Sequence, residues 1–307
     1  MRKGFNATVL YWDGCQIDFL PPELVTKARS ARIGSLSCQP RRDDWNSPDM
    51  LHNFTRTLYS ILDDFAKDRL ALAMVHYPYI DTLGHKYGPD SEETKRAVRD
   101  IDLTIYNLLN QRDRRSLQKT TNIYILSDHG MSYPTNEIKL REYIDMTRVK
   151  VSIGDLYARG KGTFGMIWPI DERDTDQIYN SLHGQEIEGL HVYMKDEIPF
   201  GFHVKLNKDV SPIMIRAHPG YFIDALDESE PRGKQQKPRI GFHGYFPEEF
   251  MDMYGVMYAA GPSFRKGFIG GPLYQVDHYQ LFCHVLRIRA RNNNGSWSHV
   301  RDLIETY

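Results

Sequence analysis

One stretch of the sequence limits the possible folds more than any other. Between residues 70 and 126 an apolar segment, an amphipathic helix and a second apolar segment follow one another. The run at residues 70–75 is continuously apolar, as is typical of strands covered on both faces of a parallel sheet. Ser91 is a suitable N-cap for the helix, and residues 122–126 form the second strand. This order predicts a βαβ crossover, and therefore an α/β fold with a mostly parallel sheet flanked by helices.

The other patterns add elements around this unit. Apolar residues at helical spacing, among them Leu51, Phe54 and Leu58, predict a surface helix over residues 50–65. We also expect helices near residues 174–182 and 276–286, strands near residues 6–11, 15–19, 190–194 and 254–259, and polar loops at residues 81–88 and 228–238. No linker or internal repeat interrupts the chain, so we assign residues 1–307 to one domain.

Charge and hydropathy exclude some classes of function. The 39 Lys and Arg residues nearly balance the 40 Asp and Glu residues, so no strong field would attract nucleic acid polymers. The longest uncharged apolar run is far shorter than the ~20 residues of a membrane span. The basic start at Arg2 and Lys3 is not followed by the apolar core of a signal peptide. We expect a small-molecule substrate, no transmembrane span and no export signal within this chain.

Polar residues of the kinds that bind metals fall where strands are predicted to end. Asp81 and His85 share one segment, where Gly84 is expected to let the backbone turn so that both face one point. Asp128 and His129 directly follow the second strand. The carboxyl ends of parallel strands are where such sheets bind ligands.

His243 lies between glycines in a third segment. Each segment alone has a simpler interpretation: a capped turn with a solvent-facing His85, a helix cap at Asp128, or a glycine-rich turn around His243. Together they supply carboxylate and imidazole ligands, the mixture that suits zinc.

The motifs, in this order, resemble the nucleotide pyrophosphatase/phosphodiesterase family, a branch of the alkaline phosphatase superfamily. They are Tyr11-Trp12-Asp13-Gly14-Cys15, Asp81-x-x-Gly84-His85-x-x-Gly88-Pro89, Ser127-Asp128-His129-Gly130-Met131, Gly241-x-His243-Gly244-Tyr245, Gly261-Pro262 and Asn293-Asn294-Gly295-Ser296-Trp297. The resemblance covers nearly the whole chain. It implies an alkaline-phosphatase-like α/β fold and a zinc-dependent phosphoric diester hydrolase with two zinc ions in each intact active site.

The resemblance also implies roles for particular residues. Asp81, His85 and His243 correspond to the ligands of one zinc ion, and Asp128 and His129 to ligands of the other. In the family, a strand with a further zinc-binding Asp and a helix that begins with a Thr or Ser nucleophile precede these motifs. The chain is therefore expected to be the rear part of a single catalytic domain, to lack the opening strand and nucleophile helix, and to be catalytically incomplete.

Within the family, the opening and closing motifs most resemble the choline-specific glycerophosphodiester phosphodiesterases. That resemblance implies attack of the hydroxyl nucleophile on phosphorus and release of phosphocholine from glycerophosphocholine or lysophosphatidylcholine. Tyr77, Tyr79, Tyr133 and Trp168 are candidates for an aromatic pocket around the quaternary ammonium. One alternative is a nucleotide pyrophosphatase/phosphodiesterase, which needs an aromatic slot for a base. A second, from another class, is an inactive, metal-stabilised binding module.

The resemblance implies an extracellular or cell-surface location. Asn6, Asn53 and Asn294 begin acceptor triplets for N-glycosylation, which matter only in an exported protein. Cys15 and Cys38 bracket an irregular segment with little apolar content, so a disulfide is expected in an oxidising compartment; two free thiols are the alternative. Cys283, on an apolar helix face, is expected to be a buried thiol.

Overall fold

The structure is a computed structural model of the chain, and it describes residues 6–11, 36–39, 50–154, 160–225 and 239–305. The chain divides into two compact units. The first contains residues 1–80, 96–125 and 257–307, and the second contains residues 81–95 and 126–256. The strand expected at residues 15–19 and the loop expected at residues 228–238 lie outside the described residues.

A parallel sheet organises the first unit. Its order is β2 (Leu36–Gln39), β1 (Ala7–Leu10) and β3 (Leu72–Val75), and β1 pairs in parallel with both neighbours. The expected strand at residues 70–75 is therefore confirmed over Leu72–Val75, but its parallel partner is β1 and not the strand expected at residues 122–126. The other strand of the predicted crossover, β4 (Ile123–Leu126), forms a separate pair with β12 (Met257–Ala260). The two strands of the predicted βαβ unit are thus not neighbours in one described sheet.

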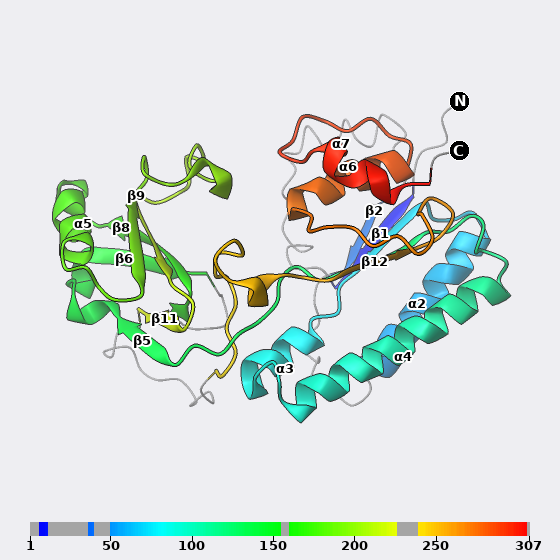
Figure 1. The fold of residues 1–307 in the computed structure, drawn as a ribbon, viewed down its shortest axis with the longest axis horizontal. Coiled ribbons are helices and arrows are strands. Elements are labelled where there is room, and N and C mark those ends of the chain that lie inside the picture. The colour runs from blue at the N-terminus through cyan, green and yellow to red at the C-terminus, as the bar shows by residue number, and fades with distance from the viewer. Residues whose placement is uncertain (1–5, 12–35, 40–49, 155–159, 226–238, 306–307) are drawn as a thin grey trace. The chain divides into compact units, whose positions relative to one another are not determined.

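Two long helices lie side by side in this unit (Figure 1), where Arg115, just after α4, donates to Asp63 of α2 over 2.7 Å. The helix α2 (Met50–Ala66) buries Phe54 and Ile61, as its apolar stripe predicts. At the start of α4 (Glu92–Arg114), the Ser91 hydroxyl accepts a hydrogen bond from the Thr94 amide over 3.2 Å, which confirms the predicted cap.

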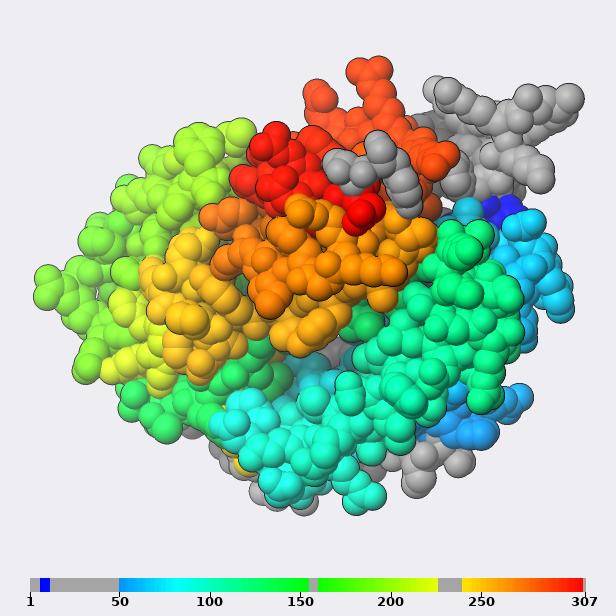
Figure 2. Space-filling view, turned by 45° about the vertical axis from the view of Figure 1, so that its right-hand side comes forward, coloured from blue at the N-terminus to red at the C-terminus, as the bar shows by residue number. Residues whose placement is uncertain are grey.

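The helical spacing of Val98, Ile101, Ile105, Leu108 and Leu109 predicts that they share one apolar face of α4, and this prediction is only partly correct. Ala97 and Thr104 are buried, whereas Val98 is 47% exposed. Small residues make the close contacts of this helix, so a pattern based on large apolar residues misplaces its buried face. Figure 2 shows α4 along the surface of the first unit, where Leu103 and Tyr106 are exposed.

The last part of the first unit packs two short helices on a small apolar cluster. The helices are α6 (His278–Val285) and α7 (Trp297–Val300). The cluster contains Phe264, Leu281, Val300 and Ile304. Cys283 is buried and free, as predicted. Asp277 at the start of α6 accepts hydrogen bonds from the Ser296 amide at 2.7 Å and the His299 Nδ1 at 2.9 Å, which fix the asparagine-rich segment before α7.

The second unit contains an antiparallel sheet that the sequence analysis did not predict. Its order is β6 (Val149–Ile153), β8 (Phe164–Pro169), β10 (Ile213–Ala217) and β9 (Leu190–Met194), and all neighbours run antiparallel. The expectation of a mostly parallel sheet is therefore wrong for this unit. Antiparallel strands need no helical crossover, so the irregular spacing of these strands carries no βαβ signal. The individual strand at residues 190–194 is confirmed.

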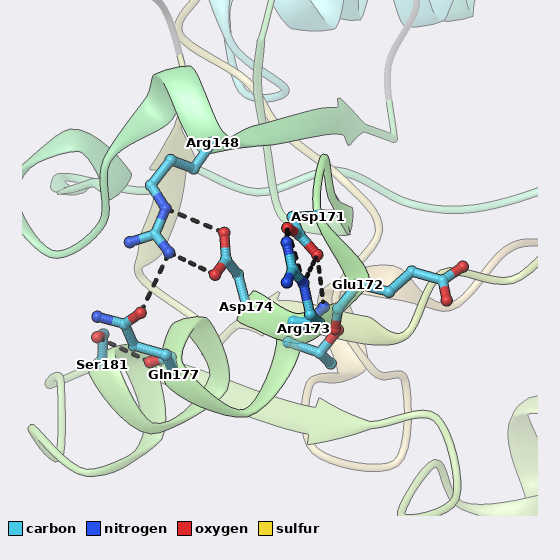
Figure 3. Close-up of polar contacts among 8 residues, drawn as sticks. Arg148, Asp171, Glu172, Arg173, Asp174, Gln177 and Ser181 are labelled. Atoms are coloured by element: carbon cyan, nitrogen blue, oxygen red, sulfur yellow. Dashed lines mark hydrogen bonds and ion pairs between the residues drawn. The ribbon is translucent and has the colours of Figure 1, made fainter.

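The helix α5 (Thr175–His183) covers this sheet and contributes Ile178 and Leu182 to its core. Figure 3 shows how the helix begins beside Arg148, which precedes β6. The Arg148 guanidinium donates to Asp174 over 3.1 Å and to Gln177 over 3.2 Å. These contacts join the start of the helix to the start of the strand.

A smaller mixed sheet completes the second unit. Its central strand β11 (Tyr221–Asp224) pairs in parallel with β5 (Asn136–Lys139) and antiparallel with β7 (Lys161–Gly162). Short 3₁₀ turns lie at Leu140–Glu142, Met146–Arg148, Glu172–Asp174, Phe200–Phe202 and Met251–Met253 in this unit and at Gln275–Asp277 and Arg301–Leu303 in the first. The described residues thus form a mixed α/β fold in which only part of the sheet structure is parallel.

The predicted polar loop at residues 81–88 is instead the helix α3 (Tyr79–Tyr87). Asp81 lies in its first turn and His85 in its last, which complements the helix dipole. The helix ends at Gly88, whose φ of 96° is left-handed and whose amide donates to the Gly84 carbonyl over 2.8 Å. None of the helices among the described residues combines the length and apolar character needed to cross a bilayer.

Candidate metal centre

Three side chains from two segments of the second unit converge on one point. Asp81 and His85 lie one turn apart on α3, and His243 comes from the segment that follows residue 239. His85 Nε2 lies 3.2 Å from Asp81 Oδ1 and 3.1 Å from His243 Nε2. The three ligand atoms lie within 4.8 Å of one another, so the predicted convergence of these residues is confirmed.

A backbone carbonyl orients one of the imidazoles. His85 Nδ1 donates to the Gly241 carbonyl over 2.7 Å, which leaves its Nε2 with a lone pair that faces Asp81 and His243. The tautomer is assigned from this hydrogen bond. Imidazoles that bind metals through one nitrogen are typically held in this way through the other.

The carboxylate opposite this imidazole requires a positive partner. Asp81 Oδ1 is buried and has no hydrogen-bond donor among the described residues. Burial opposes ionisation of Asp81, but while the imidazoles are protonated the hydrogen bond from His85 and the positive charges of His85 and His243 outweigh it and lower the pKa of Asp81 below its ordinary value. In the neutral form that binds a metal, His85 instead presents a lone pair to Asp81. An anionic oxygen and a nitrogen lone pair 3.2 Å apart repel each other unless a cation lies between them. This donor set fits a divalent metal ion, and the mixture of one carboxylate and two imidazoles suits zinc.

Close packing of two glycines holds the ligand segments together. A Cβ on Gly241 would lie 2.4 Å from the Gly84 carbonyl oxygen and 2.6 Å from Met131 Sδ. A Cβ on Gly84 would lie 2.5 Å from the same sulfur. The predicted role of Gly84 as a turn residue is therefore wrong: it lies within α3 and allows the other two segments to approach. Gly244, with a φ of 97°, does need the left-handed region.

Asp128 and His129 lie against this triad. The ring of His129 stacks on that of His243 with centroids 3.6 Å apart, and its Nδ1 donates to the Gly130 carbonyl over 2.8 Å. His129 Nε2, which keeps its lone pair, is 3.4 Å from Asp128 Oδ2. Their assignment as ligands of a second ion stays a prediction. The backbone at Gly130 allows a close approach, because a Cβ there would meet the Asp252 carbonyl oxygen at 1.9 Å.

A cavity of about 240 Å³ adjoins the triad. Its lining includes His85 and His243 of the triad together with Phe164, Phe242 and Lys161. Lys161 also contacts Asp224 at 3.2 Å. The carboxylates of Asp224 and Glu137 outweigh the effect of burial and raise the pKa of Lys161.

Two residues near the site carry no sequence signal. The Thr163 hydroxyl donates to the His243 carbonyl over 2.6 Å and so fixes that segment. Arg239 Nη1 lies 3.3 Å from both ring nitrogens of His85. Neither residue belongs to a motif, and no spacing rule links them to the ligands; only the fold brings them there.

The four aromatic candidates for a substrate pocket have other contacts. Tyr77 packs on Phe54 in the core of the first unit with centroids 4.7 Å apart and on Tyr79 at 6.3 Å, and burial raises the pKa of Tyr77 to about 12. The Tyr133 hydroxyl accepts a hydrogen bond from the Asp90 amide over 2.8 Å. Trp168 lies on β8, paired with Lys150 of β6. Their role toward a substrate stays a prediction.

The remaining predicted sites are only partly described. Asn53 on α2 and Asn294 are exposed, whereas the Asn6 amide donates to the Arg69 carbonyl over 3.0 Å. Cys15 lies outside the described residues, and only the backbone of Cys38 is described, as the partner of Val9. The expected disulfide is therefore not tested.

Comparison with known proteins identifies the family. The family described as type I phosphodiesterase / nucleotide pyrophosphatase matches residues 1–246. The chain belongs to this family. Human ectonucleotide pyrophosphatase/phosphodiesterase family member 5 is 31% identical over 244 residues, which cover 78% of the chain and 47% of the relative. Mouse family member 7 is 27% identical, over 99% of the chain and 65% of the relative.

Solved structures agree with this membership. Human family member 5 superposes with a TM-score of 0.79 at 26% identity, over 99% of the chain and 73% of that structure. An inactive variant of mouse family member 5 in complex with AMP gives a TM-score of 0.78 at the same identity. The chain spans between about half and two thirds of the length of the curated relatives named above, 47% and 65%.

Proposed function

We propose that the site of this chain is the metal centre of a zinc-dependent phosphodiester hydrolase. The observation that carries this proposal is the convergence of Asp81 Oδ1, His85 Nε2 and His243 Nε2 within 4.8 Å, with the lone pair of His85 Nε2 facing the other two ligand atoms. Membership of the phosphodiesterase family supports it.

The residues have separable roles in this proposal. Asp81, His85 and His243 hold one ion, and the Gly241 carbonyl keeps His85 in the tautomer that can bind it. Asp128 and His129 supply ligands for a second ion. Bound zinc would act as a Lewis acid on the phosphoryl oxygens and as an activator of the attacking hydroxyl.

For the substrate, we propose a choline phosphodiester such as glycerophosphocholine or lysophosphatidylcholine. The motifs at residues 11–15 and 293–297 support this choice. Nucleotide esters are the second candidate, because an inactive variant of mouse family member 5 is solved with AMP and a human relative that is 30% identical is named a bis(5'-adenosyl)-triphosphatase.

Zinc titration tests the metal centre. The chelator-treated protein should bind zinc tightly, and His243→Ala should weaken binding by more than the roughly 10- to 100-fold typical of an outer-shell change. His183→Ala is the matched control, since His183 is an exposed histidine of the same unit that stacks on Tyr179. Equal zinc affinity of wild type and His243→Ala would rule the site out.

Substrate class is tested with the zinc-loaded protein. Phosphocholine should bind more tightly than AMP if choline is recognised, and the reverse order would favour the nucleotide. Any turnover of glycerophosphocholine or of a nitrophenyl nucleotide ester should require both zinc and His243.

We also propose an extracellular or cell-surface location. The name "ectonucleotide" of the relatives supports it, as do the exposed acceptor residues Asn53 and Asn294. A glycosidase-sensitive mass shift of the protein expressed in a eukaryotic cell, lost in Asn294→Gln and Asn53→Gln, is the expected result. An unglycosylated protein would speak against it.

A further inference from the structure

Arg239 lies at the edge of the metal centre and has no role in the proposal above. Its Nη1 is equidistant, at 3.3 Å, from Nδ1 and Nε2 of His85. His85 Nδ1 already donates to the Gly241 carbonyl, so of the two ring nitrogens only Nε2 can accept from the guanidinium. The guanidinium therefore lies beside the nitrogen that faces Asp81 and His243, and the backbone that carries Arg239 holds it there.

That backbone is fixed on the C-terminal part of α3. The amides of Ile240 and Gly241 both donate to the His85 carbonyl, over 2.8 and 3.3 Å. The same short segment thus binds the backbone of His85, orients its ring through the Gly241 carbonyl and presents Arg239 next to it. Arg239 itself is half-buried. The Arg239 side chain is therefore held in the same small region as the metal ligands.

The charges at this point favour an anion. Asp81 is the only carboxylate of the triad, and it offsets one of the two charges of a divalent ion. The guanidinium of Arg239 adds a further positive charge at the same ring. Lys161, the cation of the adjoining cavity, contacts Asp224 at 3.2 Å and Glu137, whereas Arg239 contacts His85 itself. An oxyanion bound to the metal ion would therefore lie beside the guanidinium of Arg239 as well.

We infer that Arg239 binds the non-bridging oxygens of the phosphoryl group held at this metal centre, an inference that rests on the proposed function. A guanidinium presents paired donors that match phosphate oxygens, and hydrogen bonds of this charged kind are short and strong. Arg239 thereby recognises the phosphate that every candidate substrate shares. It does not distinguish choline from a nucleoside.

Binding measurements on the zinc-loaded protein test this role without turnover. Inorganic phosphate, phosphocholine and AMP are titrated into wild type, Arg239→Met, Arg239→Lys and the control Arg173→Met, which removes a charge from an exposed turn of the same unit. Arg239→Met should weaken all three ligands by the same factor, about 10- to 100-fold, as expected for a hydrogen bond to a charged group. Arg239→Lys should recover part of that loss, and Arg173→Met should change nothing.

Zinc affinity separates this inference from the proposed function. Arg239→Met should bind zinc as tightly as wild type or more tightly, which also shows that the variant folds. If Arg239→Met binds zinc and retains wild-type phosphate affinity, or if only AMP is weakened, the role of Arg239 is wrong while the metal centre stands. If wild type binds no zinc, or binds zinc but no phosphate, the proposed function fails and the inference fails with it.

Discussion

The contact between Gly241 and Gly84 predicts that a single added methyl group disrupts the metal centre. In Gly241→Ala the new Cβ would lie 2.4 Å from the Gly84 carbonyl oxygen and 2.6 Å from Met131 Sδ. The sulfur can move, but the carbonyl belongs to the backbone of α3 and cannot. Overpacking of this kind typically destabilises by about 1–3 kcal/mol, and we expect the upper part of that range.

The same methyl group should weaken zinc binding. It displaces the Gly241 carbonyl, which accepts the hydrogen bond from His85 Nδ1 over 2.7 Å. Loss of an outer-shell partner of this type lowers metal affinity by about 10- to 100-fold. Urea unfolding of the chelator-treated protein and a competitive zinc titration measure the two effects separately.

Two further glycines make the test quantitative. Gly84→Ala meets only the flexible side chain of Met131, so it should be milder, with about 0–2 kcal/mol of destabilisation after the gain of about 1 kcal/mol from alanine in a helix. Gly201→Ala, where no atom lies within 4 Å of the new Cβ, should stay within about 0.5 kcal/mol of wild type. If Gly241→Ala matches Gly201→Ala in both stability and zinc affinity, the packing argument is refuted.

Three other outcomes are expected. Zinc at about 100 times its Kd should raise the free energy of unfolding by about 2.7 kcal/mol. A chelator should reverse this increase, and His243→Ala should abolish it. A melting temperature of wild type that does not depend on zinc would contradict this prediction. Asp277 is 1% exposed, and although burial opposes its ionisation, the Ser296 amide and His299 lower its pKa. The ionised Asp277 therefore stabilises the fold at pH values above its unfolded pKa near 3.8, and this stabilisation is lost as the pH falls below that pKa. Asp277→Asn should lower the free energy of urea unfolding at pH 7 by about 1–3 kcal/mol, whereas the control Asp302→Asn, at an exposed position, should not lower it. Burial and the charge of Arg216 lower the pKa of His191, so the free energy of unfolding should decline as the pH falls below the unfolded pKa of 6.5. His191→Gln should flatten that decline. An unchanged urea midpoint of wild type between pH 7.5 and 5.5 would refute this prediction.

The ligand triad was predictable because its residues form compact motifs. Asp81 and His85, four positions apart, share one face of a helix as readily as one side of a loop, so the error about α3 did not change which side chains point together. The convergence of His243 with them followed from the resemblance and is confirmed by the fold.

The second unit was less accessible to sequence reasoning. Its antiparallel strands are short, and their register depends on partners far away in the chain, such as Ile213 with Ile167 and with Met194. The roles of Gly84 and Gly241 depend on how closely two segments approach, which periodicity does not encode. Arg239 reaches the centre through backbone hydrogen bonds to α3, and composition carries no trace of those bonds.

The separation of His85 and His243 by 158 positions has a consequence for the order of assembly. An ion bound to both would act as a cross-link, and closing a loop of that length in an unfolded chain loses about 5 kcal/mol of entropy in the chain-entropy model. Before folding, an ion can engage only local pairs of ligands, such as Asp81 with His85 or Asp128 with His129. The antiparallel sheet of the second unit, whose strands all lie between these two histidines, must therefore form first, and loading with metal becomes the last step in the maturation of the site rather than its nucleus.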